Sequence, residues 1–291
     1  MSVGAGLRAR GRTAHRSGTT PQLVVGISIV AVVVLGTVLA PLLAPYDPNA
    51  VDLGSMLSAP SIDPFHPFGT DQVGRDVLSR VLYGGRAALI VGLFSTLIAV
   101  TLGVLFGLLA ATGRTVDAVI GRIADIQLSI PGLVLALLAL SLFGTTPLGI
   151  IIIIGLEWWP MHYRVVRDKI RELTASPFVE ASRLGGSGRL RTFGGHILPH
   201  LIPVLAVTVT FNVSTAVLAE SGLSYLGLGS QPPTANWGLM IAESRTQLGD
   251  AWWGPVFPGL ALVVFLIGVQ MVGDALSRRF AATGRGGVPW I

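Results

Sequence analysis

The residues that could do chemistry are few in this chain, and their spacing argues against catalysis. There is no cysteine, and the single lysine, Lys169, does not follow a glycine-rich loop. A phosphate-binding P-loop needs Gly-Lys followed by Ser or Thr, so this chain cannot supply one. His196 and His200 have the i,i+4 spacing of a metal pair, but we interpret them as polar residues at a membrane boundary. We expect no catalytic residue, no metal site and no cofactor bound by this chain.

Acidic residues in or beside apolar stretches are the other candidates for chemistry. Glu157 stands next to Trp158 and Trp159, and Glu220 follows a long uncharged stretch. A carboxylate inside a membrane is costly without a partner, so such residues commonly serve a transport pathway or a contact between helices. Glu157 could alternatively be an interfacial carboxylate at the end of a span. We therefore regard Glu157 and Glu220 as possible pathway or subunit-interface residues.

The composition indicates that membrane helices position these residues. Of the 291 residues, 51% are hydrophobic and 12% are charged, and the mean hydropathy is +0.70. Soluble domains carry about 25% charged residues, and a soluble protein this apolar could not cover its surface. We therefore expect an all-α integral membrane protein surrounded by lipid. The basic pI does not predict a nucleic-acid partner, because the charges lie between apolar stretches rather than on one basic face.

Six apolar stretches are candidates for membrane-spanning helices, which need about 20 apolar residues. Residues 126–156 carry no charge and are too many for one ordinary span, and the turn at Gly144 and Pro147 divides them. The first stretch is longer than the apolar core of a typical signal peptide, so we favour a retained helix over a cleaved one. The predicted spans are 23–43, 87–111, 126–143, 148–163, 197–219 and 255–272.

The basic residues predict the orientation of the chain. Sixteen of the 20 Lys and Arg residues lie on one side of the predicted spans, and only Arg75, Arg80, Arg86 and Arg245 lie on the other. Cytoplasmic loops carry such an excess, which puts both termini inside a bacterial plasma (inner) membrane. The predicted order is a cytoplasmic tail (1–22), the first span, an extracytoplasmic loop (44–86), a transmembrane domain (87–276) with a cytoplasmic loop (164–196), and a cytoplasmic tail (277–291).

The cytoplasmic loop contains a short predicted helix over residues 177–184. Ser176-Pro177 is typical of a helix start, with a capping hydroxyl followed by proline. Gly185-Gly186 is typical of a helix end. A helix this short is marginal alone in water, so it needs a surface, either the lipid interface or a soluble partner.

A second amphipathic helix is predicted on the outer side, before residue 87. Thr70 could cap this helix, and Gly84-Gly85 could end it. It would either anchor at the membrane interface or help to receive a soluble partner. Two acid–base pairs with the favourable i,i+4 order support it: Asp71–Arg75 and Asp76–Arg80.

The cytoplasmic loop also carries Glu180-Ala181-Ser182, then Gly186, then Ile197-Leu198-Pro199. This order resembles the EAA signature of ABC importer permeases, with Ser182 in place of the usual second alanine. In that family the segment forms a coupling helix that sits in a groove of the ATPase subunit. The resemblance implies ATPase coupling for Phe178, Val179, Glu180, Ala181, Ser182 and Gly186.

Further segments resemble the dipeptide, oligopeptide and nickel importers of the same family. Residues 66–71 (HPFGTD) and 73–80 (VGRDVLSR) precede the second span, and residues 220–229 (ESGLSYLGLG) follow the fifth. The resemblance implies a type I ABC importer permease with six spans, the second of two permease types, for dipeptides or oligopeptides. The alternatives are a permease of this family for nickel or another small solute, and a self-sufficient secondary transporter, which would predict internal repeats.

The resemblance also implies partners for this chain. They are a second homologous permease, one or two ABC ATPase subunits that bind ATP and Mg²⁺, and an extracytoplasmic substrate-binding protein. Each permease would form half of the translocation pathway, and ATP hydrolysis would take place in the partner subunits.

Overall fold

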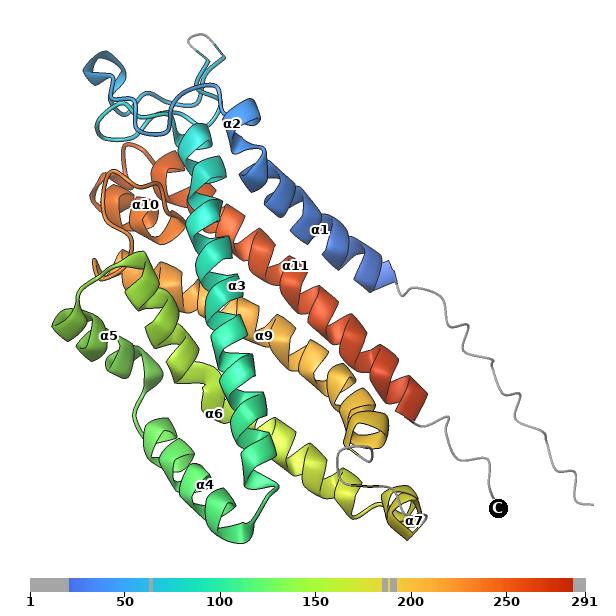
Figure 1. Cartoon of the computed structure of the whole chain (residues 1–291). Coiled ribbons are helices and arrows are strands. Elements are labelled where there is room, and N and C mark those ends of the chain that lie inside the picture. Colours follow the sequence, from blue (N-terminus) through green and yellow to red (C-terminus); the bar gives the residue numbers. More distant parts are fainter. Residues whose placement is uncertain (1–20, 63–64, 185–187, 189–192, 285–291) are drawn as a thin grey trace, which may run out of the picture.

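The computed structural model describes residues 21–62, 65–184, 188 and 193–284, which form an elongated bundle of helices (Figure 1). Within these residues there is no β-strand, only two isolated bridges, Ser61–His66 and Thr70–Asp76. The elements are α1 (Pro21–Val38), α2 (Ala40–Leu43), η1 (Leu53–Ser55), α3 (Val77–Ala110), α4 (Arg114–Leu128), α5 (Gly132–Phe143), α6 (Pro147–Thr174), α7 (Pro177–Leu184), the π-helix η2 (Phe193–Ile197), α9 (Leu198–Tyr225), α10 (Trp237–Ser244), η3 (Arg245–Gln247) and α11 (Trp253–Gly284).

Four helices are long and apolar enough to cross a membrane, namely α1, α3, α9 and α11. The pair α4–α5 is a fifth span if its halves, which meet at 86°, are counted as one bent unit. The 28-residue α6 does not qualify, because Glu157, Pro160 and the aromatic residues between them lower its mean hydropathy. The all-helical class is thus confirmed for the described residues, with four or five spans by length and composition.

The N-terminal part of α3 differs from the prediction. We expected a separate amphipathic helix that ends at Gly84-Gly85, but α3 runs through both glycines as one helix of 34 residues. Both are buried, and a Cβ at Gly85 would lie 2.9 Å from Trp237 Cζ2. The glycines therefore allow a distant side chain to approach the helix closely, and they do not end it.

The predicted span 126–143 is two helices rather than one. α4 ends at Leu128, and α5 begins at Gly132 after an 86° bend. Pro131 explains the break, because proline disfavours the helical conformation of the residue before it and cannot donate a backbone hydrogen bond. The predicted boundary at Gly144 and Pro147 is confirmed, since α5 ends and α6 begins there.

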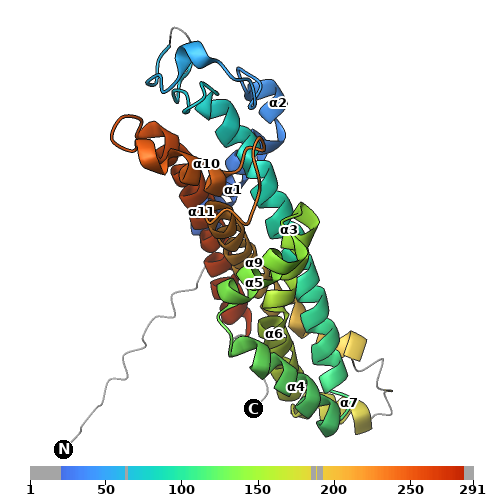
Figure 2. The same cartoon turned by 90° about the vertical axis from the view of Figure 1, so that its left-hand side faces the viewer.

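The long helices pack side by side, and the contact between α3 and α6 is the most extensive (Figures 1 and 2). Small residues bring these two backbones together: a Cβ at Gly107 would lie 2.6 Å from Val166 Cγ1, and one at Gly155 would lie 2.7 Å from Ile98 Cβ. Such contacts are the usual basis of helix association in lipid. One end of the bundle holds α10 and the loop that precedes α3, and the other end holds α7.

Candidate functional site

The helix α7 has the bounds that the sequence predicts. Ser176 does not cap it with its hydroxyl, however. The Oγ of Ser176 donates to the carbonyl oxygen of Leu173 in α6, and its own carbonyl accepts from the N–H groups of Val179 (3.1 Å) and Glu180 (3.2 Å). Ser176 therefore ends α6 and begins α7, so that only two residues separate the two helices.

The structure describes the side chains of two of the six predicted coupling residues. Val179 is fully buried within this chain, whereas Glu180 is exposed. Val179 therefore fixes α7 to the bundle, and Glu180 faces outward where a partner could meet it. The other predicted residues are Phe178, Ala181 and Ser182, whose side chains lie outside the described part of the structure, and Gly186, which lies outside it entirely.

Charged side chains join α4 to α6 near the same end of the molecule. Asp117, in the first turn of α4, is buried and pairs with both Arg167 and Arg171 of α6. Nη2 of Arg167 donates to Oδ2 of Asp117 over 2.9 Å, and the Tyr163 hydroxyl lies 3.3 Å from Asp117 Oδ1. Because charge-assisted bonds of this kind are strong, α4 is tied to the part of α6 that leads into α7.

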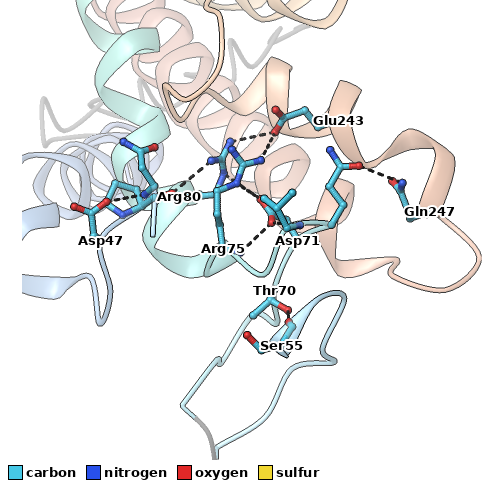
Figure 3. Close-up of polar contacts among 12 residues, drawn as sticks. Asp47, Ser55, Thr70, Asp71, Arg75, Arg80, Glu243 and Gln247 are labelled. Atoms are coloured by element: carbon cyan, nitrogen blue, oxygen red, sulfur yellow. Dashed lines mark hydrogen bonds and ion pairs between the residues drawn. The ribbon is translucent and has the colours of Figure 1, made fainter. Parts of the chain in front are cut away.

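Buried ion pairs fasten the opposite end of the molecule (Figure 3). Nε of Arg75 lies 2.6 Å from Oδ2 of Asp71, which confirms the predicted pair, and Arg75 Nη2 lies 3.1 Å from Oε2 of Glu243 in α10. Arg80 of α3 is only 1% exposed; it shares Glu243 at 3.1 Å and donates to the Pro48 carbonyl over 3.4 Å. The two arginines and the two carboxylates thus neutralise one another, as buried charges require. They also join the loop that precedes α3 to α3 itself and to α10.

Asp76 has other partners than the predicted Arg80 side chain. As the N-cap of α3, its Oδ2 accepts from the backbone N–H and the hydroxyl of Ser79, each at 2.7 Å. Its Oδ1 lies 2.9 Å from His66 Nδ1. The predicted Asp76–Arg80 side-chain pair is therefore wrong, because the capping position turns this carboxylate toward the unpaired N–H groups of the first helical turn.

Local hydrogen bonds order the rest of the loop that precedes α3. The carboxylate of Asp52 accepts from the Ser55 hydroxyl at 2.7 Å and from the Gly54 N–H at 3.0 Å, and these bonds lower the pKa of Asp52. Thr70, which we expected to cap a helix, instead accepts from the Ser58 N–H at 2.8 Å. It therefore closes the loop and begins no helix.

Glu220 lies in a polar cluster between α9 and α10. Its side chain is completely buried, and its Oε1 accepts from Ser224 Oγ at 2.8 Å and from Asn236 Nδ2 at 2.7 Å. Asn236 in turn caps α10 by accepting from the N–H of Leu239. Glu220 therefore connects the end of α9 to the start of α10.

Gln127, near the end of α4, contacts the part of α6 that contains Pro160. This proline has no N–H to donate to the carbonyl of Leu156, four residues earlier. Gln127 Nε2 donates to that carbonyl at 2.7 Å and to the Glu157 carbonyl at 3.0 Å. The Oε1 of Gln127 accepts from Trp159 Nε1 at 2.9 Å. One side chain thus satisfies the backbone that the proline leaves unpaired and attaches α4 to α6.

The carboxylate of Glu157 lies against the first residue of α5. A Cβ at Gly132 would lie 2.6 Å from Glu157 Cδ, so a larger residue there would displace the carboxylate from its present position. The Glu157 side chain is partly exposed. Among the residues that the structure describes, none gives the Glu157 carboxylate a hydrogen bond or an ion pair. Glu157 is thus a predicted site residue whose carboxylate has no partner among the described residues.

Several polar residues of these clusters were not predicted, among them Asp117, Gln127 and Glu243. Gln127 had a signal in the sequence, because it is a polar residue in an apolar stretch. The other two depend on partners that are distant along the chain, up to 168 residues for Arg75 and Glu243. In the described ranges, no three His, Cys, Asp or Glu side chains gather as a metal site would need.

Comparison with known proteins identifies the family to which this chain is related. The family described as binding-protein-dependent transport system inner membrane component matches residues 103–283. A protein of Brucella suis named as a peptide transport system permease is 36% identical over 264 residues, which cover 91% of this chain and 88% of that protein. A protein of Escherichia coli K12 named as the D,D-dipeptide transport system permease DdpC is 36% identical over 258 residues, covering 88% and 86%.

A solved structure shares the fold. A chain from the inward-facing MetNI methionine ABC transporter has a TM-score of 0.50 and 22% identity, and the match covers 68% of this chain and 92% of that one. The family match runs from within α3 to the end of α11 and includes α7 and the α4–α5 break. The chain therefore belongs to the family of binding-protein-dependent transport system inner membrane components.

Proposed function

We propose that this chain is a permease subunit of an ATP-driven ABC importer for dipeptides or oligopeptides and forms half of its translocation pathway. The observation that carries this proposal is the agreement of the relatives: both named permeases act, by their names, in peptide or D,D-dipeptide transport, and each aligns over most of its length. The chain would cross the inner membrane six times, with α6 as one crossing and with both termini in the cytoplasm.

The partners would supply the energy and the cargo. One or two ABC ATPase subunits would bind ATP and Mg²⁺, because this chain has no P-loop lysine. A second, homologous permease would complete the pathway, and a substrate-binding protein would deliver peptides from outside. This chain would then be no enzyme itself.

The mechanical route would begin at α7. Movement of the ATPase subunits would shift α7, and the short link at Ser176 would pass that shift to α6. α6 would carry it to α3 through their close glycine contacts and to α4 through Asp117. ATP and the loaded binding protein would thereby change the populations of inward-open and outward-open states, as ligands do when they bind two states unequally.

The test measures ATPase activity of the complete complex in vesicles, with peptide-loaded binding protein present. We expect Glu180→Ala and Gly186→Asp each to lower the stimulated activity about tenfold, which corresponds to roughly 1.4 kcal/mol, while the complex stays assembled. The matched control is Glu172→Ala, because Glu172 is an exposed carboxylate of α6 that contacts only Lys169 among the described residues. Unchanged stimulation and unchanged transport in both variants would contradict the coupling role and leave α7 as a helix that rests on lipid.

A further inference from the structure

The carboxylate of Glu157 lies at a depth where it needs a polar environment. It precedes Arg164 by seven residues of α6, about 10 Å at 1.5 Å per residue, and Arg164 pairs with Asp125 at the cytoplasmic end of the apolar region. Charged side chains at such a depth almost always face a water-filled cavity or the interior of the protein, because hydrocarbon does not solvate them. The exposed side of Glu157 therefore does not face lipid.

The backbone beside Glu157 leads to the same conclusion independently. Ser129, Ile130 and Pro131 join α4 to α5 without helical structure, and all three are exposed in the single chain. Irregular backbone within a membrane occurs only where protein covers it or where it lines a water-filled cavity, since lipid cannot satisfy its polar groups. The break and the carboxylate thus mark one face of this chain that is turned away from lipid.

The charge of the Glu157 carboxylate favours a cation on this face of the chain. Glu157 already occupies the N-terminal end of α5, where the helix dipole favours a negative charge, and Gly132 leaves the space for it. No Lys, Arg or His of the described residues forms an ion pair with this carboxylate. An ammonium group that arrives from outside the chain would supply the missing partner, whereas a second anion would be repelled.

We infer that the Glu157 carboxylate lines the translocation pathway at the α4–α5 break and binds ammonium groups of the cargo as it passes. This inference rests on the proposed function, since peptides carry ammonium groups at the amino terminus and on lysine. Glu157 acts on selectivity among cargoes, and it has no part in the ATPase coupling of α7.

The first measurement is thiol labelling, which the absence of cysteine in this chain makes simple. Glu157→Cys and Leu156→Cys are each placed in the complete complex, with the complex of the unchanged chain as the background. Leu156 is the matched control, because it is 46% exposed at the adjacent position of α6 and is an apolar residue that lipid can accept. We expect a charged, water-soluble thiol reagent to modify the Glu157→Cys variant at least tenfold faster. Equal, slow labelling of both variants would overturn the pathway position.

The second measurement is the turnover of Ala-Lys-Ala relative to that of Ala-Glu-Ala, at saturating amounts of the loaded binding protein. Saturation removes the selection that the binding protein makes, so the ratio reports the membrane step. We expect Glu157→Gln to lower the ratio about fivefold, as expected for one partly exposed ion pair, and Glu157→Lys to lower it further. An unchanged ratio in both variants would overturn cation binding even if the thiol is accessible. If the unchanged complex moves no peptide, the proposed function fails, while the labelling still tests the position of Glu157.

Discussion

The N-terminal end of α3 and the middle of α6 differ in how their charged side chains are paired. At the N-terminal end of α3, Arg75 and Arg80 are matched by Asp71 and Glu243, and these four residues are called the outer cluster below. The outer cluster needs no counter-charge from outside the chain. At the α4–α5 break, the Glu157 carboxylate has no partner among the described residues. A satisfied cluster holds elements together, because any movement would leave a buried charge unpaired. An unsatisfied charge costs free energy in the resting chain and is retained where a passing ligand or a neighbour can compensate it.

This difference in charge pairing divides the molecule into two regions, one held by buried ion pairs and one around the α4–α5 break. The outer loop, α3 and α10 form one fastened unit. The part around α4, α5 and α6 has a broken helix, a proline in mid-helix and an open carboxylate. Substitutions in the outer cluster should affect stability, and substitutions at the break should affect conformation and transport.

The largest effect should follow from Glu243→Ala. Removing this carboxylate leaves Arg75 and Arg80 with one shared counter-charge in a buried site, and breaking a buried ion pair typically costs about 3–5 kcal/mol. We expect a clear fall in the melting temperature of the purified complex. The exposed pair of Lys169 and Glu172 provides the control, since Glu172→Ala should cost no more than about 1 kcal/mol. Equal melting temperatures for the two variants would mean that the outer cluster does not fasten the fold.

A smaller and more local effect is expected for Gln127→Ala at the break. The change leaves the Leu156 carbonyl and the buried Trp159 indole N–H unpaired, and an unsatisfied buried donor costs about 1–3 kcal/mol. Hydrogen exchange should become faster in α6 around Pro160 and stay unchanged at Arg75 and Arg80.

The control for Gln127→Ala is Ser141→Ala, because Ser141 is exposed and bonds only within its own helix. Faster hydrogen exchange both around Pro160 and at Arg75 and Arg80 would contradict the separation into two regions. Unchanged exchange around Pro160 would show that solvent already satisfies the groups that Gln127 contacts.

Local signals in the sequence predicted one region much better than the other. The helix α7 was predicted with its bounds, because Ser176-Pro177 acts on the backbone beside it. The α4–α5 break had an equally local signal in Pro131, which the apolar character of the whole stretch concealed. The outer cluster was predicted only as far as its one local pair, Asp71–Arg75.

The remaining features depend on contacts between distant parts of the chain. Gly84-Gly85 is typical of a helix end when read locally, and only the indole of Trp237 explains why α3 continues through it. Likewise, Arg80 could be assigned to Asp76 by spacing, but its actual partner, Glu243, lies on α10. Spacing identifies candidate pairs along one helix, and it carries no information about elements that fold back from elsewhere.

The smallest effect should come from Gly107→Ala, at the contact that joins the two regions. A methyl group there would lie 2.6 Å from Val166 Cγ1, and both residues are buried, so α3 and α6 must move apart slightly. Overpacking of this kind costs about 1–3 kcal/mol, at the lower end when the helices can shift. The control is Gly113→Ala, where no atom lies within 4 Å of the added methyl group. If α3 and α6 transmit movement from α7, Gly107→Ala should also lower peptide-stimulated ATPase activity more than its loss of stability explains. A variant that melts earlier but keeps full stimulation would show that this contact supports the fold without coupling the two regions.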